Sequence, residues 1–491
     1  MMAMKKVEVK DLTHQSTGGE NTMKKVKILS AGLACCMALS MAACSSNGST
    51  GTSSSTQTAE TGTAASGDKV TITVWTKNRH DLEYMTEVVE KFNASNDHIY
   101  IDYVVQSDNF ENLVQMAVSS GDAPDVISNG NDASFTDFAT NGIILPINEY
   151  LEKDETYCTV NEAYDHLYEG INVVGEDIYW IPCGKRSGTR MIVNQDIMDK
   201  NSLEFPTTLE GLVETCSTIS ENGGGVEYGM VIPGASSPFE RWIEGSAEMS
   251  GVVPYDYVNG RFDFSGYAEI LQYVREIFNT NGMLPGSSSM KVDPSRVQFS
   301  EGVVGMMGNA SQEVTVLTEQ FPAKCNWSVY DIPTLTGEIK GALSCSANNG
   351  YQIVSTTKHP DEAWEVISYF GSEEVLKGYL EGGYTLPMSD YMDGVIDKSK
   401  IGRLADFSGA DYEAIYPVWP SVTPEGETYD VALWNACLPD GPDIQQTIDN
   451  LNETYNKALD DAVAMGKVQR LVIKDFDPMN PGAGTVEYLS E

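Results

Sequence analysis

Predicted strands and helices alternate at the start of the globular part of the chain, and this order constrains the fold more than any other feature. Residues 70–75 and 99–105 are short runs rich in β-branched and aromatic residues, which predicts strands. Between them, apolar residues recur at helical spacing over residues 82–92. A second predicted helix, residues 109–119, leads to a third predicted strand, residues 125–128. The order is typical of an α/β layer with a parallel sheet, in which ligands bind beyond the carboxyl ends of the strands.

Length, charge and cysteine content narrow the classes of function. A chain of 491 residues is too long for one ordinary core, which predicts two lobes. Its formal net charge of −40 repels phosphate backbones and anionic lipid headgroups, so nucleic acid is not an expected partner. The nine cysteines include no CxxC pair, so we expect no metal site and no cofactor. Cys325 and Cys345 either pair or remain isolated thiols, and the sequence leaves both alternatives open.

Residues 23–43 have the pattern of a signal peptide. Three lysines open the segment, and an uncharged, mostly apolar stretch follows that is too short for a comfortable transmembrane helix. Ala43 and then Cys44 end it, with Met41 at the position where a bacterial lipobox usually has Leu. The resemblance to a lipobox implies lipidation of Cys44 and an extracytoplasmic protein that is anchored to the outer face of the cytoplasmic membrane. The alternative is ordinary cleavage near Ala43.

Two further N-terminal segments are expected to lie outside the fold. Residues 1–22 precede the signal peptide and are interpreted as a mis-start or leader. Residues 44–68 comprise the lipidated cysteine and a stretch of Ser, Thr and Gly without large apolar side chains. Such a stretch cannot bury enough surface to offset its ordering entropy, so a flexible tether is predicted.

Several motifs, each weak alone, follow one another in an order that is specific. The segment Gly121-Asp122-Ala123-Pro124-Asp125-Val126-Ile127 follows the second predicted helix, and further motifs occupy residues 141–151, 192–197, 205–210, 297–309, 327–333, 348–353, 363–370 and 383–387. Together they resemble the extracellular solute-binding proteins of ABC importers, in the sugar-binding family 1. Val193 stands where the family usually has Tyr, and Thr208 where it usually has Trp.

The resemblance implies a two-lobed α/β fold of the periplasmic-binding-protein type II, in which each lobe is a mixed sheet flanked by helices and hinge crossings join the lobes. The N-terminal lobe is expected to contain residues 69–184 and 333–386, and the C-terminal lobe residues 185–332 and 387–491. The implied function is that of a monomeric substrate-binding lipoprotein. It would close on a carbohydrate ligand, an oligosaccharide, in the cleft between the lobes. It would deliver this ligand to the membrane permease subunits without altering it.

The loops that the resemblance places at the cleft supply the side chains that a sugar requires. Aromatic planes suit its C–H faces, and planar amide, carboxylate or guanidinium groups suit its hydroxyls. The expected aromatic contacts are Trp75, Trp180, Trp242 and Tyr384. The expected polar contacts are Asn78, Arg79, Asn129, Lys185, Arg186, Glu240, Asn309, Asn348 and Asn349. For Trp242 a position in the core is an equal alternative.

Two other functions stay open at this point. A binding protein for an acidic or other non-sugar solute is one, because Arg79, Lys185, Arg186 and Arg190 gather in the expected cleft segments. A glycan-active enzyme is the other, since carboxylates are plentiful. The sequence contains no GxSxG, HExxH, GxGxxG or P-loop motif, and no catalytic residue is predicted.

The pattern also predicts where individual helices begin. Asp81 is expected to cap the first helix, and Thr207 to form a capping box with Glu210. Two amphipathic helices are predicted over residues 267–278 and 442–465.

Overall fold

One sheet carries the first three predicted strands. The computed structural model describes residues 69–106, 109–128, 135–408 and 410–490. In it, β1 (Val70–Thr76) pairs in parallel with β2 (Ile99–Val105) and with β3 (Val126–Ser128), and β15 (Gln352–Ile353) adds an antiparallel edge. The order is β15-β3-β1-β2. The predicted parallel α/β layer is therefore confirmed, and the carboxyl ends of β1 and β3 lie side by side.

Four helices belong to this first sheet: α1 (Leu82–Ser95), α2 (Phe110–Ser120), α12 (Pro360–Phe370) and α13 (Glu373–Glu381). On α1 the predicted apolar face is buried, from Met85 to Phe92. The predicted role of Asp81 is wrong, because its side chain makes no capping hydrogen bond. The carboxylate is buried and instead accepts a hydrogen bond of 2.7 Å from the Tyr379 hydroxyl on α13. A long-range contact thus replaces the local one.

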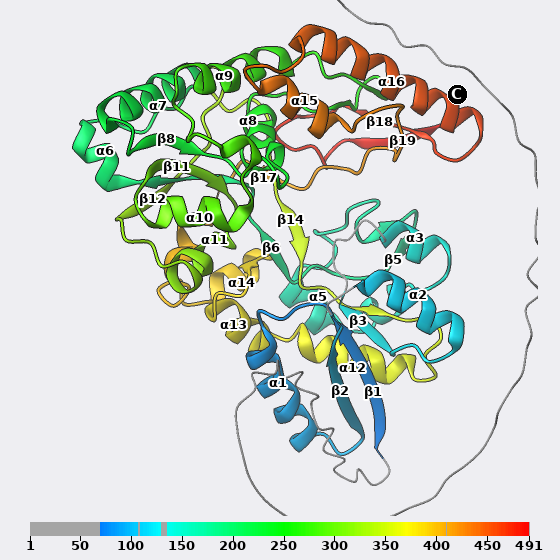
Figure 1. Ribbon diagram of the computed structural model, residues 1–491. Coiled ribbons are helices and arrows are strands. Elements are labelled where there is room, and N and C mark those ends of the chain that lie inside the picture. The colour runs from blue at the N-terminus through cyan, green and yellow to red at the C-terminus, as the bar shows by residue number, and fades with distance from the viewer. Residues whose placement is uncertain (1–68, 107–108, 129–134, 409, 491) are drawn as a thin grey trace, which may run out of the picture. The chain divides into compact units, whose positions relative to one another are not determined.

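A second sheet has the order β12-β7-β11-β8. Here β11 (Val304–Asn309) runs parallel to β8 (Tyr228–Val231) and antiparallel to β7 (Arg190–Asn194), which pairs with β12 (Trp327–Tyr330). The helix α7 (Leu209–Gly223) packs against β8, and α9 (Tyr267–Asn279) packs against α7 (Figure 1). The helices α15 (Tyr429–Cys437) and α16 (Ile444–Ala464) pack in turn against α9. The cap of α7 is Thr208, whose hydroxyl accepts the N–H of Gly211 at 3.1 Å, so the prediction of Thr207 is wrong by one residue.

The two sheets define the two lobes of this article: the first lobe surrounds β15-β3-β1-β2, and the second surrounds β12-β7-β11-β8. Between them runs a small crossing sheet of β14 (Ser346–Asn348), β6 (Gly184–Arg186) and β16 (Leu386–Pro387) (Figure 1). Met392 on α14 (Asp390–Val395) clusters with Val160 and Leu380, so the chain still packs with the first lobe beyond residue 386. The lobe boundaries themselves stay a prediction.

The remaining elements are shorter or peripheral. They are α3 (Phe135–Thr140), α4 (Asn148–Leu151), α5 (Glu155–Asn161), β4 (Val173–Val174), β5 (Asp177–Ile178), α6 (Gln195–Asn201), η1 (Phe239–Arg241), α8 (Ile243–Met249), β9 (Tyr255–Asp256), β10 (Arg261–Phe262), η2 (Ser287–Ser289), α10 (Val292–Ser300), α11 (Glu313–Thr315), η3 (Val316–Gln320), β13 (Leu343–Ser344), η4 (Gly402–Phe407), β17 (Glu413–Ala414), β18 (Arg470–Lys474) and β19 (Thr485–Leu489).

The cysteines of the described residues are free thiols, and they include Cys325 and Cys345. The isolated-thiol alternative is therefore the one that the structure supports for this pair. Cys44, the predicted signal peptide and the predicted tether lie outside the described residues.

Close packing of Gly350 against the ring of Trp180 leads to a stability prediction. A Cβ added to Gly350 would lie 2.0 Å from Cε3 of the fully buried Trp180 ring, so Gly350→Ala forces the ring or the backbone to move. Overpacking of this kind costs about 1–3 kcal/mol. We expect the variant to unfold at lower denaturant concentration than the parent protein.

Gly394→Ala is the matched control, because Gly394 lies in α14 and a Cβ there meets no atom within 4 Å. Helix propensity favours Ala over Gly, so this variant should be as stable as the parent protein or more so. Equal unfolding midpoints for the two variants would show that the contact between Gly350 and Trp180 carries no such constraint.

Candidate functional site

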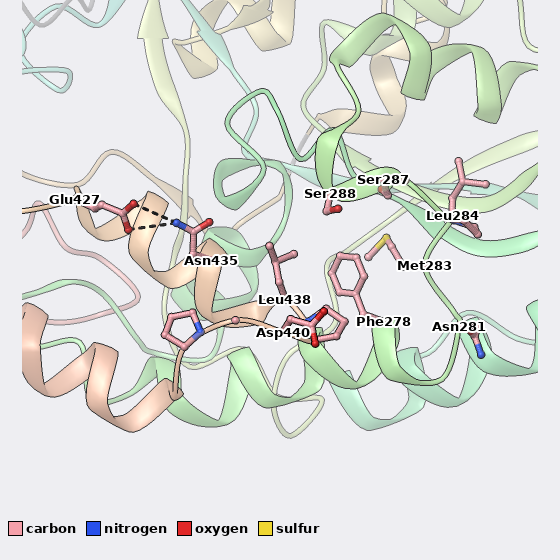
Figure 2. Close-up of a pocket in the computed structure, with 15 residues that line it drawn as sticks. Phe278, Asn281, Met283, Leu284, Ser287, Ser288, Glu427, Asn435, Leu438 and Asp440 are labelled. Carbon is pink, nitrogen blue, oxygen red and sulfur yellow. Dashed lines mark hydrogen bonds between the residues drawn. The ribbon is translucent and has the colours of Figure 1, made fainter. Parts of the chain in front are cut away.

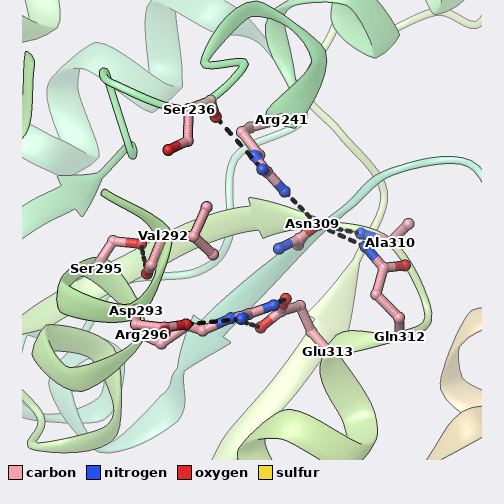
Figure 3. Close-up of polar contacts among 10 residues, drawn as sticks. All are labelled: Ser236, Arg241, Val292, Asp293, Ser295, Arg296, Asn309, Ala310, Gln312 and Glu313. Atoms are coloured by element: carbon pink, nitrogen blue, oxygen red, sulfur yellow. Dashed lines mark hydrogen bonds and ion pairs between the residues drawn. The ribbon is translucent and has the colours of Figure 1, made fainter. Parts of the chain in front are cut away.

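Asn309 ends β11 and is the centre of a polar group in the second lobe (Figure 3). Its Oδ1 accepts hydrogen bonds from the backbone N–H of Ala310 (3.0 Å), from Nε2 of Gln312 (3.0 Å) and from Nη1 of Arg241 (3.3 Å). The other terminal nitrogen of Arg241 donates to the backbone oxygen of Ser236 at 3.3 Å. Three donors therefore fix the orientation of the Asn309 amide, which is only 4% exposed. The N–H donors of Arg241 and Gln312 around it are chemically suited to hydroxyl oxygens.

A buried ion pair supports the loop that follows Asn309. The Glu313 carboxylate is fully buried, and Arg296 Nε donates to its two oxygens at 3.2 and 3.1 Å (Figure 3). Nη2 of Arg296 also donates to Glu313, and Nη1 donates to Asp293 at 3.0 Å. Removing one partner would leave an uncompensated buried charge, so the pair fixes α10 against the start of α11.

Several carboxylates gather beside Arg241, on η1 and α8. Burial raises the pKa of Glu244 to about 7, the hydrogen bond from the Tyr429 hydroxyl (2.9 Å) opposes this shift, and the charges of Glu240 and Asp430 add to it. Burial, followed by the charge of Glu244, holds the pKa of Glu248 well above its ordinary value. Glu240 was predicted to bind ligand. It is exposed, and partial burial followed by the charge of Asp430 raises its pKa.

In the first lobe, the predicted residues lie at or just beyond the carboxyl end of β1. Trp75 pairs with Ile127 across the sheet, and its half-buried ring packs against the cluster that contains Phe135. The loop after β1 holds Asn78, whose backbone N–H donates to Thr76 Oγ1 at 3.1 Å, and the exposed Arg79. The structure therefore brings Trp75, Asn78 and Arg79 to one sheet edge. Asn129 lies outside the described residues.

The crossing sheet brings three further predicted residues together, Lys185, Arg186 and Asn348. Lys185 in β6 lies opposite Ala347 in β14, and Asn348 lies opposite Gly184. The Asn348 Oδ1 accepts a hydrogen bond of 2.9 Å from the Thr385 hydroxyl. Arg186 ends β6 and is exposed.

The residue after β14, Asn349, has a left-handed backbone with φ of 54°. Tyr384 precedes the third crossing strand, and its ring centroid lies 6.3 Å from that of His80. His80 belongs to the loop after β1, so Tyr384 lies beside the first-lobe set.

Two predicted aromatic contacts are core residues instead. The Trp180 ring is fully buried, its Nε1 donates to the backbone oxygen of Ile171 at 2.8 Å, and it packs among first-lobe residues. Trp242 is also fully buried, in the main cluster of the second lobe, against Gly308. Neither ring presents a face to a ligand in this structure. For Trp242 this is the core alternative that the sequence had left open.

Glu413 is a functional candidate that the sequence analysis missed. Its side chain is fully buried and accepts hydrogen bonds from Arg190 Nη2 (2.8 Å) and the backbone N–H of Gly188 (2.9 Å). Lys185 Nζ lies 3.9 Å from its other oxygen. The Arg190 guanidinium also lies 3.7 Å from Asp331 and 5.4 Å from the centre of the Tyr412 ring. No sequence signal could have found Glu413, because 223 residues separate it from Arg190.

A cavity of about 640 Å³ lies elsewhere in the second lobe, between the end of α9 with residues 281–288 and the end of α15 with the turn after it (Figure 2). Phe278, Met283 and Leu438 form apolar walls, and Glu427 accepts a hydrogen bond from Asn435 on the rim. None of the predicted site residues lines this cavity. Its rim carboxylates are exposed, and nothing in its lining selects a ligand.

Two features are absent from the residues that the structure describes. No group of three or more His, Cys, Asp or Glu side chains there is placed to hold a metal ion. Among the same residues, no helix has the length and apolar character that crossing a bilayer demands.

Comparison with known proteins places these features in a family. The family model for bacterial extracellular solute-binding proteins matches residues 76–377. The chain belongs to this family. No curated protein matches it in sequence.

Solved structures of solute-binding proteins share the two-lobed fold. Apo RafE from Streptococcus pneumoniae has a TM-score of 0.63 and 18% identity, over 80% of this chain and 98% of that one. The GacH receptor of Streptomyces glaucescens has a TM-score of 0.61 and 18% identity, over 80% and 99%. Lmo0181 from Listeria monocytogenes has a TM-score of 0.59 and 19% identity, over 80% and 100%. The predicted fold class is thereby confirmed.

The acids beside Arg241 should make the stability of this solute-binding protein depend on pH. Because the pKa of Glu244 is higher in the folded protein than its ordinary value of 4.5, the protonated carboxyl favours folding. This contribution is complete below pH 4.5 and is lost as the pH rises to about 7. Glu244→Gln keeps an acceptor for Tyr429 without the charge, so it should exceed the parent protein in stability by on the order of 2 kcal/mol at pH 7.5 and by little at pH 4.5.

Denaturant unfolding at a series of pH values measures this difference. Glu453→Gln is the control, since Glu453 is exposed on α16 and its substitution should give a difference that does not vary with pH. A flat profile for Glu244→Gln as well would contradict the account of the buried acids.

Proposed function

We propose that this chain is the substrate-binding lipoprotein of an ABC importer, and that it captures a neutral oligosaccharide between its lobes for delivery to the membrane permease. The family match over residues 76–377 carries the proposal. Related structures support the class of ligand: RafE has been solved with raffinose, Lmo0181 with cycloalternan, and the GacH receptor with acarbose. Each of these ligands is a saccharide or a saccharide analogue.

The polar residues at the strand ends suit this ligand. Amide and guanidinium groups follow β1 in the first lobe, and in the second lobe Arg241 of η1 meets Asn309 at the end of β11. The crossing sheet adds Lys185, Arg186 and Asn348. These groups donate to or accept from hydroxyls in a directed way, as recognition of a sugar requires. Trp75 and Tyr384 are the remaining aromatic candidates for its C–H faces.

The cations of the crossing favour a neutral ligand over an acidic one. The charge of Arg190 is compensated by Glu413 and Asp331, and Lys185 lies near the same carboxylate. Of the cations that suggested an acidic solute, Arg186 on the crossing sheet and Arg79 after β1 are exposed. A carboxylate ligand would therefore meet less positive charge here than the sequence suggests.

Binding would act through closure of the lobes. Contacts that the ligand makes with both lobes exist together in the closed form alone, so the ligand shifts the population toward that form. The permease would recognise the closed form. This mode of action needs no reaction at the ligand, and we propose no enzymatic activity for the chain.

A ligand screen tests the proposal with residues 65–491, which form one compact unit. A panel of raffinose-type, malto-, manno- and xylo-oligosaccharides is added at increasing concentration while thermal unfolding is followed. A ligand at 100 times its Kd stabilises the folded state by about 2.7 kcal/mol. We expect at least one panel member to raise the Tm, with little dependence on salt, and no panel member to be cleaved.

Arg186→Ala should weaken this stabilisation, and Lys153→Ala is its control, because Lys153 is an exposed cation on the first lobe. A panel without any shift would contradict the carbohydrate assignment. Binding that disappears at high salt would instead favour the acidic solute.

The lipoprotein part of the proposal has its own test. In the full-length chain, Cys44→Ser should release the protein from the membrane fraction and abolish incorporation of labelled fatty acid, because the thiol that carries the lipid is gone. Cys36→Ser lies within the predicted signal segment and should leave both properties unchanged. Retention of the lipid in Cys44→Ser would rule out Cys44 as the anchor.

A further inference from the structure

The segment of residues 412–418, here called the strap, contacts both lobes and two of the segments that cross between them. The first crossing is defined as residues 184–190 around β6, and the second as residues 343–348 of β13 and β14. Its backbone pairs with the second crossing: Leu343 N–H donates to the Tyr412 oxygen at 2.8 Å, and Cys345 N–H to the Ala414 oxygen at 3.0 Å. The side chain of Glu413 binds the first crossing through Gly188. The strap therefore joins two segments that lead from one lobe to the other.

Other strap residues are fixed to the second lobe. The Tyr412 hydroxyl donates to Asp331, which follows β12. The Tyr416 hydroxyl donates to the backbone oxygen of Ala342 at 2.8 Å, and the Tyr257 hydroxyl donates to the oxygen of Pro417 at 2.7 Å. Tyr257 itself is buried in the second-lobe core.

Two strap residues reach the first lobe instead. Ile415 is 6% exposed and packs in the cluster that contains Phe135, Ile171 and Trp180. Val418 lies against the turn at Gly170, where an added Cβ would be 3.3 Å from the Val418 Cβ. Between these two residues, Tyr416 and Pro417 remain fixed to the second lobe.

We propose that the strap sets the angle between the lobes in the ligand-free protein, with Ile415 as its anchor in the first lobe. When one lobe rotates against the other, the strap backbone moves with the second lobe, to which its hydrogen bonds fix it. Ile415 must then shift within, or leave, the first-lobe cluster. Close-packed clusters resist continuous deformation, so the side chain acts as a stop that favours discrete lobe angles. The inference depends on the two-lobed fold and on no property of the ligand.

Distance distributions between the lobes test the strap in the full chain without ligand. Spin labels are placed at Lys153 in the first lobe and Lys457 in the second, both 70% exposed. The labels are attached by a chemistry that spares the native thiols. We expect Ile415→Ala to broaden the interlobe distance distribution about two-fold, since several lobe angles then become accessible.

Ile144→Ala is the matched control, because Ile144 is 2% exposed in the same cluster but does not belong to the strap. It should lower the Tm to a similar extent and leave the width unchanged. An unchanged width in Ile415→Ala, or equal broadening in both variants, would overturn the proposal.

Val418→Ser provides a second measurement should Ile415→Ala fail to fold. Val418 is 53% exposed, so this substitution leaves the core intact while it weakens the contact at Gly170. A smaller broadening of the distance distribution is expected, and an unchanged width would count against the strap.

Discussion

A single buried carboxylate fixes the region in which the chain passes between its lobes. Glu413 accepts hydrogen bonds from a guanidinium and from a backbone N–H of the first crossing, while its backbone pairs with the second. Desolvation of buried charges offsets much of their mutual attraction, so such a pair adds little net stability. Separating it is costly, however, because one charge would be left buried without a partner. Its main consequence is therefore positional: the crossing strands keep one register, and the polar residues that flank them keep one arrangement.

The regular elements could be predicted from the sequence because local pattern determines them. The strand at 99–105 was predicted with its observed bounds, and the helix of α9 to within one residue. Caps were less predictable, since Thr207 and Thr208 are neighbours and residue type does not distinguish between them. The hydrogen bond of Asp81 could not be predicted at all, because its partner Tyr379 lies almost three hundred residues away in the sequence. No local rule identifies such a partner.

The residues of the candidate site also differ in how far the local sequence determines their place. The positions of Asn78 after β1 and of Asn309 at the end of β11 could be predicted from the strand pattern. Their contact with a ligand stays a prediction. The two buried tryptophans could not be separated from ligand contacts by residue type, since an aromatic ring suits a core as well as a sugar. For Trp180 a signal was present: it stands in the apolar run of residues 178–181, which favours burial on both sides. The prediction of Trp180 as a ligand contact depended on residue type and did not use this apolar context.

The composition of the chain does not reveal which charges a ligand would meet between the lobes. The chain has a net charge of −40, yet the crossing segments between the lobes are rich in cations. Structure decides how much of that positive charge is available, because Glu413 and Asp331 compensate Arg190. The carboxylate that holds the crossings together is thus also the one that lowers their positive charge. Since a neutral sugar needs directed hydrogen bonds more than net charge, the same interaction that fixes the geometry of these segments also makes their chemistry suitable for such a ligand.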